Sequence, residues 1–327
     1  MKNDIITLGH GSGCGLTRRL INDVFQSSFK MPSLDDGVEI ANRTVVTTDA
    51  HVISPIFYPG GDIGKLSITG TVNDVAMTGA VPKHLLVTFI IEEGFSIKDL
   101  KRIVKSMKDT CEEAGVSIIG GDTKVVPKGK ADGLFITSTG IGYLPENVNL
   151  SSSKISLEND IIVNNYIGDH SIAIVNAREN LELDPAPISD CAPLNSLVQT
   201  MLQNGDVNFL RDATRGGIAT ILNEIAEETG HGIILNEEDL PISEITHSVS
   251  EMLGLDPLYM ANEGVLVGFA DKAEATLIPA MKKHKYGKNS KIIGKITDEV
   301  KGVYLRTSIG GLRPLHMIES DPLPRIC

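Results

Sequence analysis

The chain has 327 residues, of which 41% are hydrophobic and 22% charged, and its formal net charge is -12. This length is sufficient for two domains of ordinary size. The negative charge argues against nucleic-acid binding, which needs a basic surface, and no stretch approaches the roughly 20 apolar residues of a membrane span.

No signal-peptide core follows the first four residues, because the chain runs from them into a glycine-rich segment. The four cysteines, at positions 14, 111, 191 and 327, show no CxxC spacing. We therefore expect reduced thiols rather than a disulfide framework, and a cytoplasmic protein.

Strand-like and helix-like segments alternate along the first half of the chain. The segment 96–114 is the clearest predicted helix, because its apolar residues form one stripe that includes Cys111, an expected core residue. Ser96 and Asp99 form an N-terminal capping pair, and Gly115 ends the helix. The other predicted elements of a first α/β domain are a helix at 63–80 and strands at 45–48, 84–91, 118–119 and 134–142.

The polar run at 151–153, which follows Pro145, marks the predicted domain boundary. The second half is predicted to form helices around 171–180 and 218–228 and strands at 160–165, 232–235, 265–269, 291–296 and 303–306. The predicted fold class is α+β, with two α/β domains and an extended tail. Its parts are a glycine-rich N-terminal segment (1–40), an N-terminal domain (41–150), a C-terminal domain (151–311) and a mobile tail (312–327).

The chain ends in a thiol, within the sequence Pro-Arg-Ile-Cys. Chain ends are normally mobile, so Cys327 could leave the body of the protein, meet a partner and return. The nearby prolines make the tail stiff and extended, which lowers the entropy lost on docking. Arg325 supplies a positive charge that favours the reactive thiolate. The alternative is a frayed end that happens to finish in cysteine.

Acidic residues recur where apolar segments break, at Asp49, Asp74, Asp122 and Asp212. Carboxylates at strand ends next to glycine suit a site for Mg²⁺ and phosphate, because hard oxygen ligands hold the metal and bare backbone approaches phosphate oxygens. Each of these residues, taken alone, can equally be a helix cap or a turn residue. The recurrence favours the metal site.

The neighbours Asn73 and Asp74 cannot both face one site on a straight helix, because adjacent helical residues point about 100° apart. Asn73 shares a stripe with Lys65, and Asp74 does not. Either only one of the pair faces the site, or Gly70 bends the helix. The sequence leaves both possibilities open.

Two further segments carry candidate ligand-binding groups. The glycine-rich stretch 9–15 is not a Walker loop, because it lacks Gly-Lys-Ser/Thr, and it is interpreted as a flap over a nucleotide or as a disordered leader. Its His10 and Cys14 are too few for a metal site. Arg215 and Gly216 lie where a helix is predicted to begin, which makes an anion cradle.

Lys124 and Glu263 are candidates for chemistry. Lys124 lies two residues after Asp122, where a strand would place it near the same site. Glu263 precedes the apolar strand 265–269, so its carboxylate is expected to be partly desolvated and able to act as a base near neutral pH. The alternative for both residues is a solvated loop charge.

Five internal motifs occur in order, at residues 60–65, 70–77, 120–126, 211–217 and 261–264. Together with the terminal Pro-Arg-Ile-Cys they resemble the HypE family of carbamoyl dehydratases of nickel–iron hydrogenase maturation, over essentially the whole chain. The internal motifs are shared more loosely with aminoimidazole ribonucleotide synthetase, selenophosphate synthetase and thiamine-monophosphate kinase. The terminal motif is the specific part.

The resemblance implies two domains of the aminoimidazole ribonucleotide synthetase type, with ATP binding and dimerisation in the N-terminal one. It implies that a partner resembling HypF places a carbamoyl group on Cys327, and that the tail folds into the ATP site. The γ-phosphoryl group would move to the carbamoyl oxygen, and loss of phosphate and a nitrogen proton would leave a thiocyanate. The cyanide would pass to iron held by a HypC–HypD-like complex.

The resemblance also assigns roles to residues, with ATP and Mg²⁺ as cofactors and a homodimer as the expected assembly. Lys124 would neutralise the developing charge, and Glu263 would take a nitrogen proton from the group on Cys327. The remaining assignments are metal binding by Asp49, Asp74 and Asp122, and nucleotide binding by Lys65, Asn73, Asp212, Arg215 and Gly216.

One departure from the family pattern is visible. The family has His-Gly-Ser-Gly-Gly near its N-terminus, and this chain has Cys14 at the second glycine of the Gly-Gly pair, where a side chain restricts the backbone. Two alternatives therefore stay open. One is a synthetase of the same superfamily that acts on a free small substrate, with Cys14 as the reactive thiol. The other is a non-enzymatic scaffold whose tail thiol binds a metal or a partner.

Overall fold

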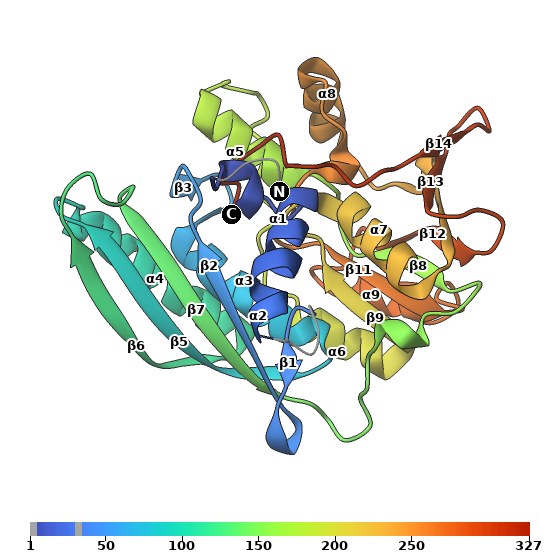
Figure 1. The fold of residues 1–327 in the computed structure, drawn as a ribbon, viewed down its shortest axis with the longest axis horizontal. Helices are drawn as coiled ribbons and strands as arrows, with labels where there is room; N and C mark the ends of the chain where they lie inside the picture. The colour runs from blue at the N-terminus through green and yellow to red at the C-terminus, as the bar shows by residue number, and fades with distance from the viewer. Residues whose placement is uncertain (1–4, 30–34) are drawn as a thin grey trace.

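The computed structural model of the protein describes residues 5–29 and 35–327, so parts of the predicted segment 1–40 lie outside the described residues. Two lobes, each built around a β-sheet, lie side by side, and the chain terminus lies between them (Figure 1). Within the described ranges no helix combines the length and the hydrophobicity that crossing a bilayer requires.

The N-terminal lobe contains a five-stranded sheet in the order β1-β2-β7-β5-β6. Only the β5–β6 pair is parallel, and the other three pairs are antiparallel. Helices α3 and α4 lie behind the sheet in Figure 1. The elements are β1 (Val38–Glu39), β2 (Thr44–His51), the short pair β3 (Phe57–Tyr58) and β4 (Gly61–Asp62), α3 (Ile63–Met77), β5 (Val81–Glu92), α4 (Ile97–Ala114), β6 (Ser117–Val126) and β7 (Leu134–Tyr143).

Helix α4 forms where the sequence predicts it. The side chain of Ser96 accepts a hydrogen bond from the backbone N–H of Asp99, and Gly115 ends the helix at φ 69°. The predicted apolar stripe is buried at Ile103, Met107 and Cys111, so the prediction that Cys111 lies in the core is confirmed. The stripe fixes which side of α4 packs on the sheet.

Helix α3 is buried on nearly all sides because it packs against both lobes, with contacts to β2 and β7 in one and to α6 and β9 in the other. The carboxylate of Asp62 caps its first turn by accepting from the N–H groups of Gly64 and Lys65. The helix runs through Gly70 without interruption. A helix buried all round is a core helix, and α3 therefore sets the position of one lobe against the other.

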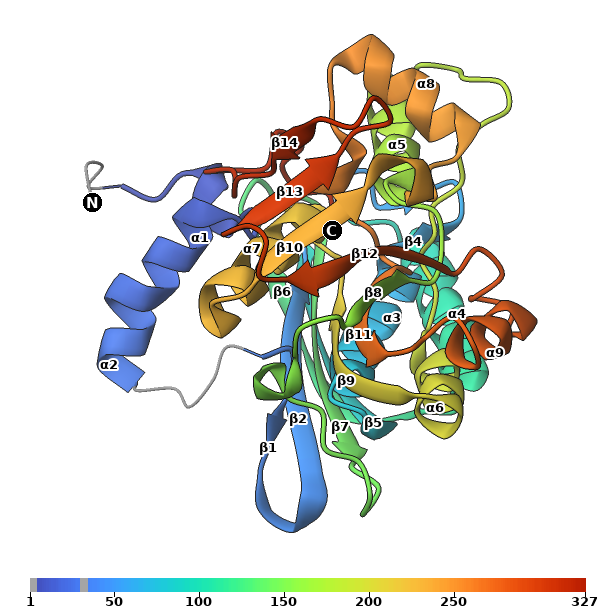
Figure 2. The same cartoon turned by 90° about the vertical axis from the view of Figure 1, so that its right-hand side faces the viewer.

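The C-terminal lobe contains a seven-stranded mixed sheet in the order β14-β13-β10-β12-β8-β11-β9. Figure 2 shows α7 on one side of this sheet and α6 and α9 on the other. The elements are β8 (Asp160–Val163), α5 (Asp169–Glu179), α6 (Asn195–Asn204), β9 (Asp206–Asp212), α7 (Gly217–Thr229), β10 (Gly232–Asn236), α8 (Glu244–Leu253), β11 (Leu266–Asp271), α9 (Leu277–Lys283), β12 (Lys291–Thr297), β13 (Val303–Arg306) and β14 (Leu312–Pro314).

Strand β8 shows how both faces of this sheet become buried. Ile161 and Val163 belong to the cluster shared with α7, whereas Ile162 belongs to the cluster shared with α6 and α9. Side chains alternate between the two faces of a strand, so a continuous apolar run is what a strand covered on both sides requires.

The glycine-rich stretch continues into a short helical arm that Figure 2 shows along one side of the molecule. The arm consists of the 3-10 turn Leu8–Gly11, α1 (Gly15–Leu20), a π-helical turn (Ile21–Gln26) and α2 (Ser27–Phe29). Short 3-10 turns complete the structure at 41–43, 152–154, 237–239 and 257–259. Residues 312–314, at the start of the predicted tail, form the edge strand β14.

The start of α7 depends on Gly217, whose φ is +62° and whose Cβ, if one were added, would lie 2.5 Å from the carbonyl oxygen of Leu258. We expect Gly217→Ala to destabilise the protein by the left-handed strain of about 1–2 kcal/mol and by a further overpacking cost of about 1–3 kcal/mol. Gly254→Ala, at φ +66° with open space around it, should show the strain alone. Urea unfolding midpoints would test the difference, and equal shifts would contradict it.

Candidate active site

A polar cavity of about 880 Å³ opens between the two lobes. Its walls come from β2, α3, the end of β9, the start of α7, the glycine-rich arm and the chain terminus. Six residues singled out from the sequence line this one cavity: Asp49, Asp74, Asp212, Arg215, Glu263 and Cys327. The fold therefore brings together residues that are far apart in the chain.

The carboxylates of the cavity repel one another. Burial, and then the charges of Asp212 and Asp49, raise the pKa of Asp74 well above its ordinary value. Burial and the charge of Asp36 raise the pKa of Asp212 in the same way. Groups in such surroundings favour a cation or a proton. The donor set of hard oxygens therefore fits Mg²⁺.

Within the described residues no three such groups converge as a ready-made metal cage. This agrees with the coordination habits of Mg²⁺, which usually keeps several waters and binds through one or two carboxylates together with substrate phosphates. The cavity therefore fits a magnesium ion that arrives with a phosphate-bearing ligand better than a permanently bound one.

The structure decides the question of Asn73 and Asp74, because only Asp74 faces the cavity. Its Oδ2 accepts a hydrogen bond from Thr47 Oγ1 at 2.9 Å. Asn73 points the other way, where Nδ2 donates to the Ala192 carbonyl at 3.1 Å and Oδ1 accepts from the Leu194 N–H at 2.7 Å. Asn73 thus joins α3 to the C-terminal lobe and does not line the cavity.

Gly70 does not bend α3, but it makes room for a neighbouring side chain. A Cβ there would lie 3.0 Å from Asp49 Oδ2 and 3.0 Å from the His51 ring. The glycine therefore lets the carboxylate of β2 approach α3 closely. The strand runs on to His51, so the prediction that Asp49 ends its strand is wrong by two residues. Among the four acidic candidates only Asp212 is the last residue of a strand.

Lys65 lies outside the cavity, as its Nζ donates to the Gly60 carbonyl at 2.9 Å. The predicted approach of Asp122 and Lys124 to the other site residues is also not met within one chain. Both lie on β6, where Lys124 Nζ and Asp122 Oδ2 form an exposed ion pair at 2.6 Å.

The sheet register explains the separation of Asp122 from Asp49. Asp49 pairs with Ser138, Ser138 with Val87, and Val87 with Gly121. Three strand spacings of about 4.8 Å place Gly121, and Asp122 beside it, about 14 Å from Asp49. One metal ion cannot bridge that distance within a single chain.

The tail is docked against both lobes. On the N-terminal side, the N–H groups of Ser54 and Val52 donate to the carbonyls of Arg325 and Cys327 at 3.2 and 3.3 Å. On the C-terminal side, Arg178 of α5 donates to the Arg325 carbonyl at 2.9 Å. The side chain of Ile326 is only 2% exposed. The backbone is therefore held up to its last residue, and Cys327 lines the cavity.

The glycine-rich arm covers the tail further back. The first two N–H groups of α1, from Gly15 and Leu16, donate to the carbonyls of Ile318 and Glu319 at 3.0 and 2.9 Å. Arg215 Nη1 donates to the Gly11 carbonyl at 2.6 Å. The stretch 9–15 is thus ordered against the tail and Arg215, and the alternative of a disordered leader is wrong.

Cys14 is fully buried, and burial, followed by the charge of Asp321, raises the pKa of its thiol. A buried neutral thiol is a poor nucleophile. The tail thiol is also neutral, because burial raises the pKa of Cys327 well above 9.0, and Arg215 opposes that rise. The prediction that Arg325 favours the thiolate is wrong, since its guanidinium contacts Asp132 Oδ2 at 2.5 Å and the Val52 carbonyl at 2.9 Å.

Glu263 is 4% exposed, so the alternative of a solvated loop charge is wrong. Its Oε1 is buried and has no hydrogen-bond partner in the structure. Burial, and then the charges of Asp212 and Asp190, raise its pKa well above the ordinary value. A desolvated carboxylate with a free oxygen is suited to accept a proton from a group placed in the cavity.

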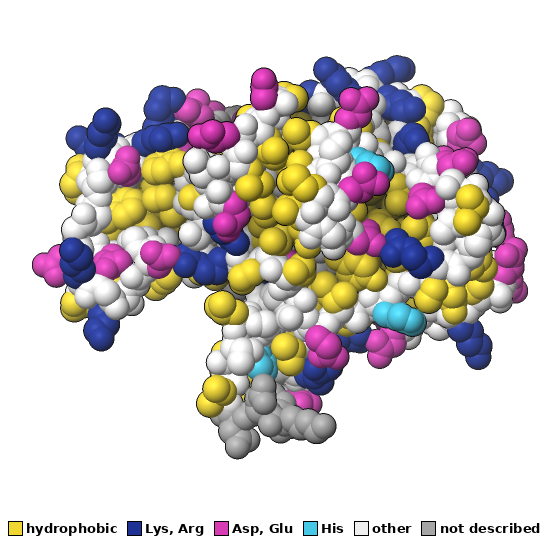
Figure 3. Space-filling view, turned by 90° about the horizontal axis from the view of Figure 1, so that it is seen from above, with side chains coloured by type: hydrophobic (Ala, Val, Ile, Leu, Met, Phe, Trp, Pro, Cys, Tyr) yellow, Lys and Arg dark blue, Asp and Glu magenta, His cyan; other side chains and the backbone are white. Residues whose placement is uncertain are grey.

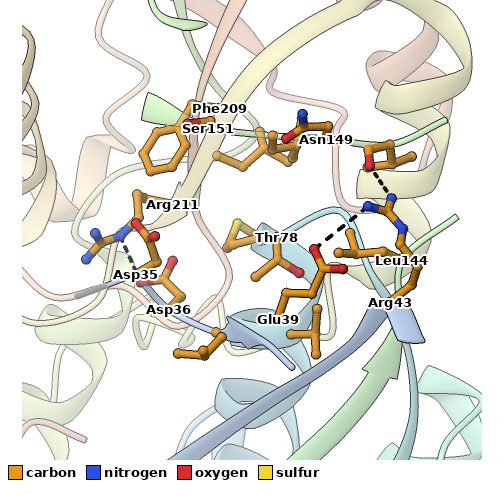
Figure 4. Close-up of a pocket in the computed structure, with 17 residues that line it drawn as sticks. Asp35, Asp36, Glu39, Arg43, Thr78, Leu144, Asn149, Ser151, Phe209 and Arg211 are labelled. Atoms are coloured by element: carbon orange, nitrogen blue, oxygen red, sulfur yellow. Dashed lines mark hydrogen bonds and ion pairs between the residues drawn. The ribbon is translucent and has the colours of Figure 1, made fainter. Parts of the chain in front are cut away.

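A second cavity of about 270 Å³ lies next to the first (Figure 4). The two share Asp35, Asp36 and Arg211 in their walls. Arg211 Nε pairs with Asp36 Oδ1 at 2.8 Å. The rest of the wall mixes polar side chains such as Glu39 and Asn149 with apolar ones. Phe209 and Leu144 lie on opposite sides in Figure 4. Asp36 was not among the residues singled out from the sequence, although the paired aspartates before Gly37 were a visible signal.

The chain is similar to known proteins over its whole length. Residues 35–144 match the AIR synthase related protein N-terminal domain, and residues 158–305 match the corresponding C-terminal domain. A carbamoyl dehydratase HypE from Cupriavidus necator is 44% identical over 100% of this chain and 96% of its own length.

Two solved structures are similar over most of their length. One is described as a HypE–HypF complex, with a TM-score of 0.87 at 42% identity, covering 91% of this chain and 99% of the other. The other is described as HypE in complex with ATP, with a TM-score of 0.84 at 38% identity, covering 99% of this chain and 100% of the other.

The burial of Asp74 and its repulsion by Asp212 and Asp49 predict that its charge destabilises the free protein. Its folded-state pKa lies above its ordinary value of 3.8, so stability falls as pH rises above that value. Asp74→Asn should therefore be more stable than wild type at pH 8, and the gain should shrink as pH falls towards 4. Urea midpoints at several pH values would test this, with the exposed Asp109→Asn as control. A gain that is the same at every pH would contradict it.

Proposed function

The chain belongs to the HypE family of carbamoyl dehydratases, and from this premise we propose that it uses ATP to remove water from a carbamoyl group on its own Cys327. The product is a thiocyanate that serves as the source of a cyanide ligand in nickel–iron hydrogenase maturation. The observation that carries the proposal is that the terminal cysteine lines the same cavity as Asp74, Asp212, Arg215 and Glu263.

The two adjoining cavities suit the two ends of ATP. The smaller one, whose wall includes Phe209, Leu144 and other apolar residues, is the proposed place of the base, and the larger one is the proposed place of the phosphates. Asp49 and Asp74 are the proposed Mg²⁺ ligands from this chain, and Asp212 lies beside them. When bound, the metal would spread the phosphate charge over the site. The ATP complex of a similar protein supports nucleotide binding in this fold.

The chemistry begins at the carbamoyl oxygen, which attacks the γ-phosphorus while the bond to the β-phosphate oxygen breaks and ADP leaves. The nitrogen gives up one proton, so an S-linked imidate phosphate forms. The carbon–oxygen bond then breaks, phosphate leaves with the oxygen, and the nitrogen gives up its second proton. Carbon and nitrogen are left triply bonded on the Cys327 sulfur.

The residues of the cavity fit these needs. Glu263 is the proposed acceptor of one nitrogen proton, because its raised pKa makes it able to hold a proton once it has taken one. The departing phosphate can take the other. Arg215 is the proposed partner for phosphate charge, since a guanidinium matches phosphate oxygens. Phosphorylation is needed because a carbamoyl oxygen is a poor leaving group and phosphate is a good one.

The proposed partners are a HypF-like carbamoyltransferase and a HypC–HypD-like complex that carries iron. The HypE–HypF complex of a similar protein supports the first. Seen from the side that carries α5 and α8, the surface has hydrophobic side chains gathered across its middle and charged ones around them (Figure 3). Such a surface suits transient protein docking. The tail must leave its docked position to meet either partner.

We also propose a homodimer through the free edge of β6. This edge strand exposes Ile119 and Val125, at 57% and 68%. Unpaired strand edges with apolar side chains are normally covered in proteins. Lys124 does not reach the cavity of its own chain, and a partner docked at this edge offers it a route to the other subunit's cavity.

The tail thiol is open to a direct test. With the carbamoyltransferase, carbamoyl donor and ATP added in turn, intact-protein mass spectrometry should show a gain of one carbamoyl mass and then a loss of one water. Cys327→Ser should show neither change while still binding ATP, because it lacks the sulfur but keeps the cavity. Cys14→Ser should behave like wild type. ATP-dependent water loss from Cys327→Ser would rule the proposal out.

Mixed dimers would test the placement of Lys124. We expect Lys124→Ala and a chain lacking Cys327 each to be nearly inactive alone. If Lys124 acts across the dimer, mixing the two should restore dehydration, because the intact tail of one chain meets the intact lysine of the other. Absence of rescue in a mixture that sedimentation shows to be dimeric would disprove action across the interface.

A further inference from the structure

A buried segment, residues 189–192, lies between the docked tail and Glu263 without lining the cavity. It precedes α6, and Ser189 and Cys191 are 7% and 2% exposed. Hydrogen bonds leave this segment in two directions. One set leads to the tail and the other to the backbone of Glu263.

The first direction runs through His170 of α5, which is fully buried. The Cys191 N–H donates to Ser189 Oγ at 3.1 Å, Ser189 Oγ lies 2.7 Å from His170 Nδ1, and His170 Nε2 lies 2.8 Å from the Ile326 carbonyl oxygen. A carbonyl only accepts, so Nε2 carries the ring proton and Nδ1 accepts from the serine. Burial lowers the pKa of His170 to about 4, which keeps the ring neutral and this arrangement intact.

The second direction holds the residue proposed to accept a nitrogen proton. The Glu263 N–H donates to Asp190 Oδ1 at 3.0 Å, and the Glu263 carbonyl accepts from the Ala192 N–H at 3.3 Å. Both polar groups of the Glu263 backbone are therefore fixed by residues 190–192. The neighbouring carboxylate of Asp190 has a raised pKa of about 7, caused by its burial.

We infer that the segment 189–192 sets the position of the Cys327 sulfur relative to the Glu263 carboxylate, with His170 and Asp190 as the positioning residues. The inference rests on the proposed dehydration at Cys327. The Ile326 carbonyl belongs to the peptide group directly before Cys327, so fixing it leaves mainly the cysteine side chain to orient. One hydrogen-bonded segment then supports both reacting groups, through His170 and through the Glu263 backbone, and small displacements between such groups cost large factors in rate.

The contact between His170 and the tail is tested with His170→Phe and His170→Gln. Phenylalanine keeps the ring shape and loses the donor, which leaves the Ile326 carbonyl unsatisfied, and glutamine offers an amide N–H in its place. We expect His170→Phe to raise the rate of Cys327 alkylation about tenfold, as measured on the C-terminal peptide by mass spectrometry. Its kcat for water loss should fall by a similar factor with KM for ATP unchanged. Glutamine should restore part of both.

The contact between Asp190 and the Glu263 backbone is tested with Asp190→Ala and Asp190→Asn. Alanine removes the acceptor of the Glu263 N–H, and asparagine retains an oxygen there. We expect Asp190→Ala to lower kcat about tenfold while Cys327 alkylation and KM for ATP stay at wild-type values. Asparagine should recover much of the loss. A change in Cys327 alkylation therefore distinguishes the effect of His170 on the tail from the effect of Asp190 on Glu263.

The matched control is His284→Phe, because that histidine contacts Ser196 and Tyr286 and not the tail. It should change neither alkylation nor kcat. Should His170→Phe fail to fold, as judged by circular dichroism and urea unfolding, Ser189→Ala removes the bond that orients the same ring and is expected to act in the same direction.

Two results would overturn the inference. One is unchanged alkylation and kcat in His170→Phe or, in its place, Ser189→Ala. The other is an equal rise in alkylation in Asp190→Ala, which would indicate general loosening. Failure of the proposed function is distinct, because the carbamoylated wild type would then show no ATP-dependent water loss, whereas the alkylation experiment would still report whether His170 holds the tail.

Discussion

The structure depends on burying several carboxylates where two lobes meet. Burial raises the pKa values of Asp36, Asp74 and Asp212, and the charge of Asp36 adds to the rise at the other two. Arg211 and Arg215 are the cations that oppose this negative charge. Such an arrangement is costly in the free protein, because charges are removed from water and set near like charges. It is useful only where further positive charge arrives with a ligand. Stability and function are therefore opposed at this site.

The lobes, the arm and the tail all meet at this centre. Helix α3 carries Asp74 on one side and, through Asn73, grips the C-terminal lobe on the other. The arm lies on the tail and on Arg215. Helix α3 and the tail, which both line the cavity, thus also join the two lobes. Relative motion of the lobes would move the charged groups of the cavity apart.

Much of the fold follows from local pattern, and much of the site does not. The stripe and caps of 96–114, and the apolar runs of the strands, depend on nearby residues and were predictable. The positions of Asp122 and Lys124 depend on strand order, which separates β6 from β2 by two intervening strands. The pairing of Asn73 with Ala192, and of His170 with Ile326, joins residues more than a hundred positions apart. The motif resemblance identified the family but not these contacts.

The reacting group on Cys327 is part of the polypeptide, so its concentration cannot vary independently of the enzyme's. The docked tail places Cys327 in the cavity of the same folded molecule, so the encounter of sulfur and site is unimolecular. On the proposed function, dilution leaves the rate per chain unchanged as long as the dimer stays assembled, and only the nucleotide can saturate the enzyme. Free thiocyanate is therefore not expected to inhibit competitively, because the docked terminus already occupies the place of the Cys327 group.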